Sequence, residues 1–323
     1  MKILVVFTGG TIGSAVSDGW IAPSDDMKYL LLKKFREKNN SSVEFDTTEP
    51  FSILSENLCA ENLNKLIKCV SENVGSYDGI IVTHGSDTLQ YTAAALAYCV
   101  ETEIPVVLVS SNYPLEDERA NGTDNFIAAT EFITAKAGKG VFISYKNKNE
   151  YTHIHSATRV ISHRESDDCV FSIDSQPYAF FDGKILLNSE YTVSHSGEKI
   201  TDGHFADNSE ILVAFVLPGE SFCYDVSRYK AVILRPYHSG TLNTESGMLK
   251  NFCENAKKHS VPVFVVNVPK GTTYLSSKEY DSLGVNALYE CSFPAVYVKL
   301  WLGISMGKEI VSFVKNPVAD EFL

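Results

Sequence analysis

The chain has 323 residues, of which 44% are hydrophobic and 21% are charged, and its formal net charge at pH 7 is −12. A chain of this length exceeds the size at which a single hydrophobic core usually stops growing, so we expect two domains. The net negative charge argues against a broad surface for nucleic acid or for an anionic membrane, because both partners are themselves negative.

The N-terminus and the cysteines indicate the compartment. Residues 2–7 form an apolar run that ends at Gly9-Gly10, which makes it too short for a signal-peptide core or a membrane span. The seven cysteines include no C-x-x-C pair, which favours unpaired thiols in a reducing compartment. We therefore predict a cytoplasmic protein with no membrane partner.

Apolar strands alternate with helices in the first half of the chain. Residues 2–7, 79–82 and 105–109 are β-branched apolar runs, typical of strands that are covered on both faces. Residues 60–74 place leucine, isoleucine and valine on one face of a helix, and residues 88–100 are Ala-rich enough for a buried helix. This βαβ alternation predicts a mostly parallel sheet.

The second half repeats the alternation after a change in character. Residues 174–205 are rich in Gly, Ser, Thr and Tyr, which predicts an irregular or antiparallel region. Strands are predicted at 231–234 and 261–266, with a helix over 245–259 between them and an amphipathic helix over 295–303.

These elements predict an α/β protein of two domains. Residues 1–205 form a larger N-terminal catalytic domain with a mostly parallel sheet and flanking helices. Residues 206–323 form a smaller, Rossmann-like parallel α/β domain.

The first candidate site is Thr8-Gly9-Gly10-Thr11-Ile12-Gly13, directly after the first strand. Ligands of open α/β sheets bind beyond the carboxyl ends of strands, so a reactive group is expected there. A dinucleotide fingerprint would need glycine where Thr8 stands, which disfavours a cofactor loop. A turn that only reverses the chain is the alternative.

The second candidate site is Thr83-His84-Gly85-Ser86-Asp87-Thr88, again after an apolar strand. Two strand ends that carry hydroxyl groups can converge on one pocket. A hydroxyl is a weak nucleophile and needs a neighbouring proton acceptor, and Asp87 beside Ser86 can belong to such a set. The N–H groups near Gly10-Thr11 or Gly85-Ser86 are candidate oxyanion donors.

Both motifs, in this order, resemble the two signatures of bacterial L-asparaginases. The resemblance extends along the chain through segments that are similar to other family segments: Ser55-Glu56-Asn57, Asn121-Gly122 with Asn125, residues 235–240 and residues 284–302. It implies an amidohydrolase that converts L-asparagine or a close relative to aspartate and ammonia, with no metal or cofactor. It also implies a homodimer or homotetramer.

The resemblance implies roles for individual residues. Thr11 would be the acylated nucleophile, Ser86 the second hydroxyl and Asp87 part of the proton relay. Ser55 would contact the α-carboxylate of the substrate, and Asp87 would also face its α-amino group. Thr8 would be structural. The substrate-binding set would also include Glu56 and Gly85, and Trp20 in the family's flexible substrate loop.

The sequence departs from the family pattern in this pocket. The family lysine that assists the second hydroxyl is expected near Ser162, and no lysine occurs over residues 156–162. Arg159 is too strongly basic to accept a proton at ordinary pH, which leaves Lys146 and Lys148 as substitutes, although charged loop residues are usually solvated.

Two further substitutions change the polarity of the pocket. Trp20 stands where tyrosine is common in the family, and Glu56 stands where glutamine or serine is common. Because like charges in one pocket disfavour each other's ionised forms, Glu56 favours a ligand with an additional cationic feature.

The histidines support weaker hypotheses. His153, His155 and His163 could bind a metal, but residues at i and i+2 of a strand more often line a polar surface. His84 lies inside the second motif, where we expect its side chain to shape the turn.

Three functions therefore compete. Amide hydrolysis follows from the paired hydroxyl motifs. A catalytically weakened or inactive protein that binds an amino acid follows from the absent lysine and from Glu56. The amidase part of a larger transamidation assembly would be favoured by an extra N-terminal domain, whereas this sequence starts on its first strand.

Overall fold

The structure of the chain is a computed structural model that describes residues 1–323 apart from 18, 40–41, 165, 195 and 272–273, and it leaves out the side chains of residues 17, 23 and 25. The chain divides into two units. The first comprises Met1–Thr192 and Lys199–Asp202, and the second comprises Val193–Glu198 and Gly203–Leu323.

The first unit is built on one large sheet. Its helices are α1 (Asp25–Lys38), α2 (Ala60–Asn73), α3 (Leu89–Cys99) and α4 (Gly122–Thr134). Its strands are β1 (Lys2–Phe7), β2 (Ser14–Ser17), β3 (Trp20–Pro23), β4 (Glu44–Thr48), β5 (Gly79–Thr83), β6 (Pro105–Val109), β7 (Gly140–Lys146), β8 (Thr152–Ser156), β9 (Ala179–Phe181) and β10 (Ile185–Leu187).

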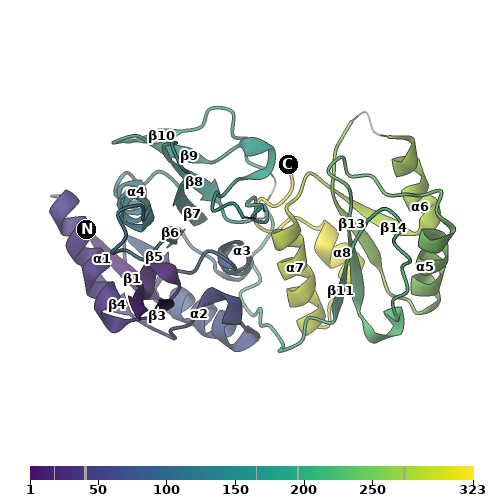
Figure 1. Cartoon of the computed structure of the whole chain (residues 1–323), viewed down its shortest axis with the longest axis horizontal. Coiled ribbons are helices and arrows are strands. Elements are labelled where there is room, and N and C mark those ends of the chain that lie inside the picture. Colours follow the sequence, from purple (N-terminus) through teal and green to yellow (C-terminus); the bar gives the residue numbers. More distant parts are fainter. Residues whose placement is uncertain (18, 40–41, 165, 195, 272–273) are drawn as a thin grey trace. The chain divides into compact units, whose positions relative to one another are not determined.

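Eight of these strands form the sheet in the order β10-β9-β8-β7-β6-β5-β1-β4 (Figure 1). β2 pairs with β3 in a separate hairpin. The strands from β4 to β7 are mutually parallel. β8, β9 and β10 extend the sheet in antiparallel fashion.

Both faces of the parallel strands are buried. Apolar side chains of β1, β5 and β6 pack with α1 and α4 in one core, which includes Val5, Ile81 and Val107. The alternate residues of the same strands, such as Leu4 and Ile80, are also buried. α3 contacts both α2 and the strand β7 of the same sheet. Burial on both faces explains why these strands read as continuous apolar runs.

The second unit carries a four-stranded parallel sheet in the order β11-β12-β13-β14. Its elements are β11 (Ile211–Phe215), β12 (Ala231–Arg235), α5 (Gly247–Lys258), β13 (Val263–Val268), α6 (Tyr280–Leu283), β14 (Val285–Tyr289), α7 (Phe293–Ser305) and α8 (Ile310–Lys315). α5 and α6 pack in a core with one face of the sheet, and α7 and α8 pack with the other.

The predicted fold class is confirmed: a large, mostly parallel sheet with helices is followed by a smaller parallel α/β unit. The strand predicted at 2–7 matches β1, and the helix predicted over 60–74 matches α2 to within one residue. Of the two alternatives for residues 174–205, antiparallel pairing occurs in β9 and β10, and the described residues after Leu187 in this range are irregular. The sequence patterns do not predict the helices α1 and α4.

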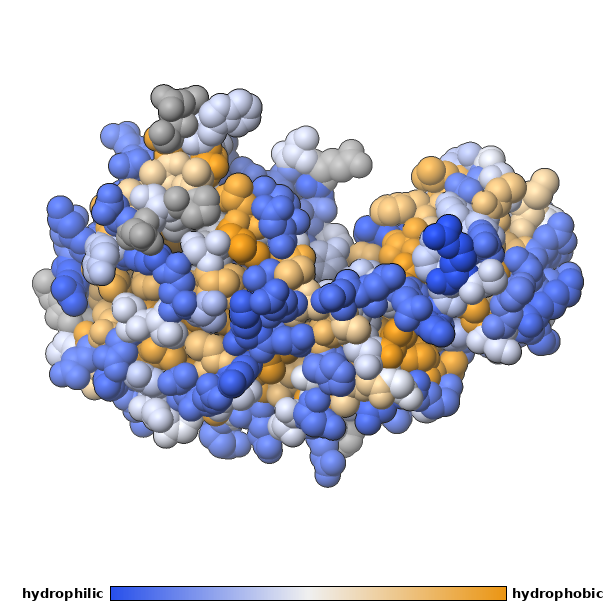
Figure 2. Space-filling view, turned by 90° about the horizontal axis from the view of Figure 1, so that it is seen from below, coloured by the Kyte–Doolittle hydropathy of each residue, from blue (hydrophilic) through white to orange (hydrophobic). Residues whose placement is uncertain are grey.

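The surface and the helices bear on membrane association. In the view of Figure 2, hydrophilic residues are spread over both units, with apolar residues among them. Among the residues that the structure describes, no helix is both long and apolar enough to cross a membrane.

Candidate active site

The two hydroxyl motifs lie at the carboxyl ends of neighbouring strands. β1 and β5 are adjacent and parallel, and their last residues, Phe7 and Thr83, are paired. From β1 the chain continues to β4 on one side and then crosses to β5 on the other, so the strand order reverses between β1 and β5 (Figure 1). Such a reversal opens a crevice where ligands bind in α/β sheets. Both motifs lie at that crevice.

Close backbone approaches bring three segments together at this edge. A Cβ atom on Gly10, which has a φ of 73°, would lie 2.2 Å from the backbone nitrogen of Gly85. A Cβ atom on Gly85 would lie 2.4 Å from Oγ of Ser55. Only residues without a Cβ fit these two positions. Thr11 and Ser86 directly follow the two glycines, so the structure brings both predicted hydroxyl residues to one place.

Several polar groups at this place have no protein partner. The hydroxyl groups of Thr11 and Ser86 are half-buried, and within the described residues neither makes a hydrogen bond. The backbone N–H groups of Thr11, Ser86 and Asp87 are likewise unpaired within that part of the chain. Because these N–H groups lie beside two hydroxyls and have no protein partner there, they are available to donate to a ligand oxygen.

Ser55 and Asp87 meet on one side of this set. The Ser55 hydroxyl lies 3.4 Å from a carboxylate oxygen of Asp87, and the Thr88 hydroxyl donates to the Ser55 carbonyl oxygen at 2.9 Å. Ser55 is buried, whereas the carboxylates of Asp87 and Glu56 are exposed. The segment around Ser55 is therefore attached to the second motif, with acidic groups facing solvent.

The buried His84 side chain connects the turn of the second motif to α3, in agreement with its predicted role in shaping the turn. Its Nδ1 lies 2.8 Å from the Gly85 carbonyl oxygen, which can only accept, so Nδ1 carries the proton. Its Nε2 then accepts from the Thr92 hydroxyl at 2.9 Å. Burial lowers the pKa of His84 to about 4, so the ring is neutral at pH 7.

The N-terminal part of the chain matches a known protein family. The N-terminal region of the asparaginase family (Asparaginase, N-terminal) matches residues 2–192. The chain belongs to the asparaginase family. Both hydroxyl motifs lie within the matched region, together with the Ser55 segment.

Relatives in the asparaginase family carry two kinds of name. A glutamyl-tRNA(Gln) amidotransferase subunit of Methanosarcina mazei is 29% identical over 263 residues, which are 76% of this chain and 59% of that protein. The L-asparaginase of Thermococcus kodakarensis is 30% identical over 211 residues, which are 64% of this chain and 62% of that protein. The chain spans 59%, 43% and 48% of three Methanosarcina amidotransferase subunits.

Solved asparaginase structures share the fold along the whole chain. The thermostable L-asparaginase from Thermococcus kodakarensis superposes with a TM-score of 0.81 at 24% identity, covering 100% of this chain and 99% of the other. L-asparaginase I from Vibrio cholerae gives 0.80 at 21% identity, with the same coverage. At these identities the likeness establishes the fold.

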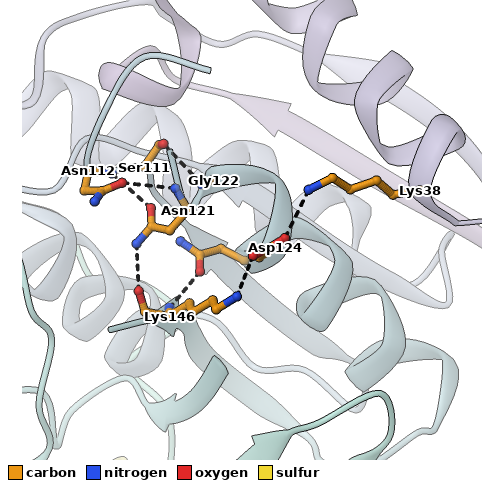
Figure 3. A network of polar contacts seen from close by, with 8 residues as sticks. Lys38, Ser111, Asn112, Asn121, Gly122, Asp124 and Lys146 are labelled. Atoms are coloured by element: carbon orange, nitrogen blue, oxygen red, sulfur yellow. Dashed lines mark hydrogen bonds and ion pairs between the residues drawn. The ribbon is translucent and has the colours of Figure 1, made fainter. Parts of the chain in front are cut away.

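Lys146 and Arg159 contact other groups, and Lys148 faces solvent. The ammonium group of Lys146 lies 2.7 Å from the Asp124 carboxylate, and its backbone bonds Asn121 and Asn125 (Figure 3). Lys146 also lines a polar cavity of about 540 Å³. Arg159 is buried, with its guanidinium 4.5 Å from the centre of the Tyr191 ring. Lys148 is exposed.

A histidine that the sequence suggests only for metal binding lies at the site instead. At Ser162, where the family lysine is expected, the hydroxyl is buried and has no hydrogen-bond partner among the described residues. The next residue, His163, places Nε2 3.1 Å from the carbonyl oxygen of Ser86. The two residues are 77 positions apart, and no local sequence pattern signals such a contact.

The other two candidate metal ligands, His153 and His155, lie on β8. His155 is buried, and its Nδ1 lies 2.8 Å from the Ser172 hydroxyl. The His153 ring packs between His155 and Phe180 in edge-to-face geometry. In the part of the chain that the structure describes, no group of three or more His, Cys, Asp or Glu side chains is placed to hold a metal ion.

Trp20 is 78% exposed on β3, in the hairpin that continues directly from the first motif. Its indole therefore packs little against the protein, and it is one of two tryptophans in the chain.

Proposed function

We propose that this asparaginase-family chain hydrolyses the side-chain amide of L-asparagine or a close relative to aspartate and ammonia, through an acyl-enzyme on Thr11. The observation that carries the proposal is the Thr11 hydroxyl close to the N–H groups of Ser86 and Asp87, none of which has a hydrogen-bond partner among the described residues. Family membership and the name of the Thermococcus kodakarensis relative support amide chemistry.

The reaction would proceed in two stages. Thr11 Oγ1 attacks the amide carbon and loses its proton through Ser86 toward Asp87, while the carbonyl oxygen gains charge and accepts bonds from the free N–H groups. The carbon–nitrogen bond then breaks, and the nitrogen takes up the proton that Thr11 released and leaves as ammonia. Water attacks the resulting ester, the bond to Thr11 breaks, and the hydroxyl and the product carboxylate form.

The neighbouring residues would orient the substrate. The buried Ser55 hydroxyl can donate to the α-carboxylate, and the exposed Asp87 carboxylate can pair with the α-ammonium group. Glu56 adds a further negative charge close to Ser55, which favours substrates that carry an additional cationic group.

Ammonia release tests the proposal. Purified protein is incubated with asparagine, glutamine and short peptides that contain asparagine, beside the variant Thr11→Ala. Thr134→Ala, which removes an exposed hydroxyl at the end of α4, is the matched control. We expect the wild type and the control to release ammonia at equal rates. The proposal is contradicted if the wild type releases ammonia no faster than Thr11→Ala with all of the substrates.

The first alternative is a catalytically weakened or inactive protein that binds an amino acid. It rests on the serine at position 162 and on the acidic side chain of Glu56. An amino-acid binder would show saturable binding of asparagine or aspartate by calorimetry without turnover. A homodimer or homotetramer remains our expectation for the active form, and light scattering measures it.

An amidase component of a transamidation assembly is the second candidate, and the names of the amidotransferase relatives favour it. Such a component would release ammonia slowly alone and faster with its partner protein. Glutamine preferred over asparagine in the assay above would support this candidate.

A further inference from the structure

The imidazole of His163 bridges two backbone carbonyl groups. Its Nε2 lies 3.1 Å from the oxygen of Ser86, and its Nδ1 lies 3.2 Å from the oxygen of Cys169. Carbonyl oxygens only accept, so each contact needs an N–H on the ring. A neutral imidazole carries one N–H and an imidazolium carries two. The ring can therefore donate to Ser86 in either charge state.

The contact with Ser86 sets the direction of the next peptide group. A trans peptide is planar, with its C=O and N–H pointing in opposite directions. When the Ser86 oxygen points at His163, the Asp87 N–H must point away from that ring. This N–H is one of those without a partner in the described chain. The other donor to the Ser86 oxygen, the Leu89 N–H, is farther away at 3.3 Å.

The loop that carries His163 is held by other bonds. The Asn147 side chain donates to the Val170 oxygen at 3.0 Å and accepts from the Val170 N–H at 2.8 Å. At the other end, the Ile161 N–H donates to the Phe171 oxygen at 3.0 Å. Because these bonds fasten the loop without His163, the bond from the ring to Ser86 acts chiefly on the active-site peptide rather than on the loop.

We infer that His163 is a positioning residue, which holds the Ser86–Asp87 peptide so that its N–H faces the bound amide. The inference rests on the proposed function, since the N–H that is aimed is one of the groups assigned to the developing oxyanion. His163 itself does not touch the substrate. Its removal lets the peptide rotate, which weakens transition-state stabilisation more than substrate binding.

Three variants test this role. His163→Ala removes the ring, His163→Gln keeps one side-chain N–H donor, and His204→Ala removes an exposed histidine of the other unit as a control. Removing an oxyanion donor outright costs about 10²–10³ in kcat, so misdirecting one is expected to cost roughly 10- to 100-fold. We expect this loss in kcat for His163→Ala, with KM within about twofold, partial recovery in His163→Gln and no change in His204→Ala.

A measurement without turnover separates this inference from the proposed function. If the wild type does not exceed Thr11→Ala in ammonia release, the proposed function fails, and the backbone ¹H–¹⁵N resonances of Ser86 and Asp87 decide the role of His163. These resonances should shift in His163→Ala and stay in place in His204→Ala.

Two results would overturn the inference. One is a kcat for His163→Ala within twofold of the wild type, or, in a protein without turnover, unmoved Ser86 and Asp87 resonances. The other is a loss of kcat in His163→Ala that comes with a clear drop in melting temperature and is not recovered in His163→Gln. That pattern marks a purely structural residue.

Discussion

Two polar clusters of the molecule differ in how completely their groups are paired. At the candidate active site of the first unit, hydroxyl and N–H groups of Thr11 and Ser86 have no partner in the described chain. In the second unit, Lys299 and Glu321 are almost fully buried and form an ion pair. Glu321 also accepts from the N–H groups of Val318 and Ala319, and the Lys299 ammonium also bonds the Asn316 carbonyl oxygen.

The difference separates groups that serve binding from groups that serve folding. Burial lowers the pKa of Lys299, and the Glu321 carboxylate opposes this shift only in part, while the Asn316 carbonyl oxygen also bonds the ammonium. The cluster attaches the C-terminal residues to α7. The groups of the hydroxyl motifs that lack partners in the described chain add little to the stability of the fold. Their removal should therefore change function and leave the free energy of unfolding almost unchanged.

Thr11→Ala should show the largest effect. We expect amide hydrolysis to fall roughly 10³-fold or more, because a nucleophile has no substitute, while the free energy of unfolding stays within about 0.5 kcal/mol. Ammonia release and urea unfolding measure the two quantities. A marked loss of stability would mean that the hydroxyl is paired after all, and would remove the contrast between the clusters.

Glu321→Ala should have the opposite profile. An uncompensated Lys299 ammonium remains buried, so we expect the free energy of unfolding to fall by about 3–5 kcal/mol. Hydrolysis at a temperature where the variant is folded should be unchanged. Glu61→Ala, which removes an exposed partner of Lys65, should lower the free energy of unfolding far less in the same urea titration. Equal costs for the two variants would contradict the distinction.

Acid should destabilise the first unit through His84 and His155. Burial lowers the pKa of His84 to about 4 and that of His155 to about 3, whereas both titrate near 6.5 when unfolded. As the pH falls below about 6.5, the unfolded chain binds protons that the folded chain does not, so stability declines. Each residue should contribute a loss of about 2 kcal/mol by pH 5.

Urea unfolding between pH 7.5 and 5 measures this decline, with His155→Gln as the variant that removes one of the two titrations. The slope of stability against pH should become shallower in that variant and stay unchanged in His204→Gln. A flat profile for the wild type would show that neither ring is kept neutral by burial.

Ser55→Ala should show the smallest effect. The Ser55 hydroxyl makes only a long contact with Asp87, so its loss should leave stability unchanged. A lost bond to the charged α-carboxylate should raise KM for asparagine about tenfold with little change in kcat. Ser76→Ala, an exposed control, should change neither. A kcat loss larger than the rise in KM would place Ser55 in the chemical step instead.

Much of the first unit could be predicted because its local patterns are strong. The buried strands β1, β5 and β6 read as continuous apolar runs, and α2 shows one clear apolar face. α1 was missed because its exposed face is dense in lysine and arginine, and α4 was missed because it begins at Asn121-Gly122, a turn-like pair. The boundary at residue 205 and the cytoplasmic location stay predictions.

The sequence by itself determined the alternation of strands and helices and the positions of Thr11, Ser86 and Asp87 just after two strand ends. These features depend on neighbours within a few residues, so they leave a local pattern. Only the tertiary structure decided that Gly10 meets Gly85 and that His163 reaches Ser86. Contacts between distant segments depend on strand order and backbone approach, and no local pattern of residue types records them.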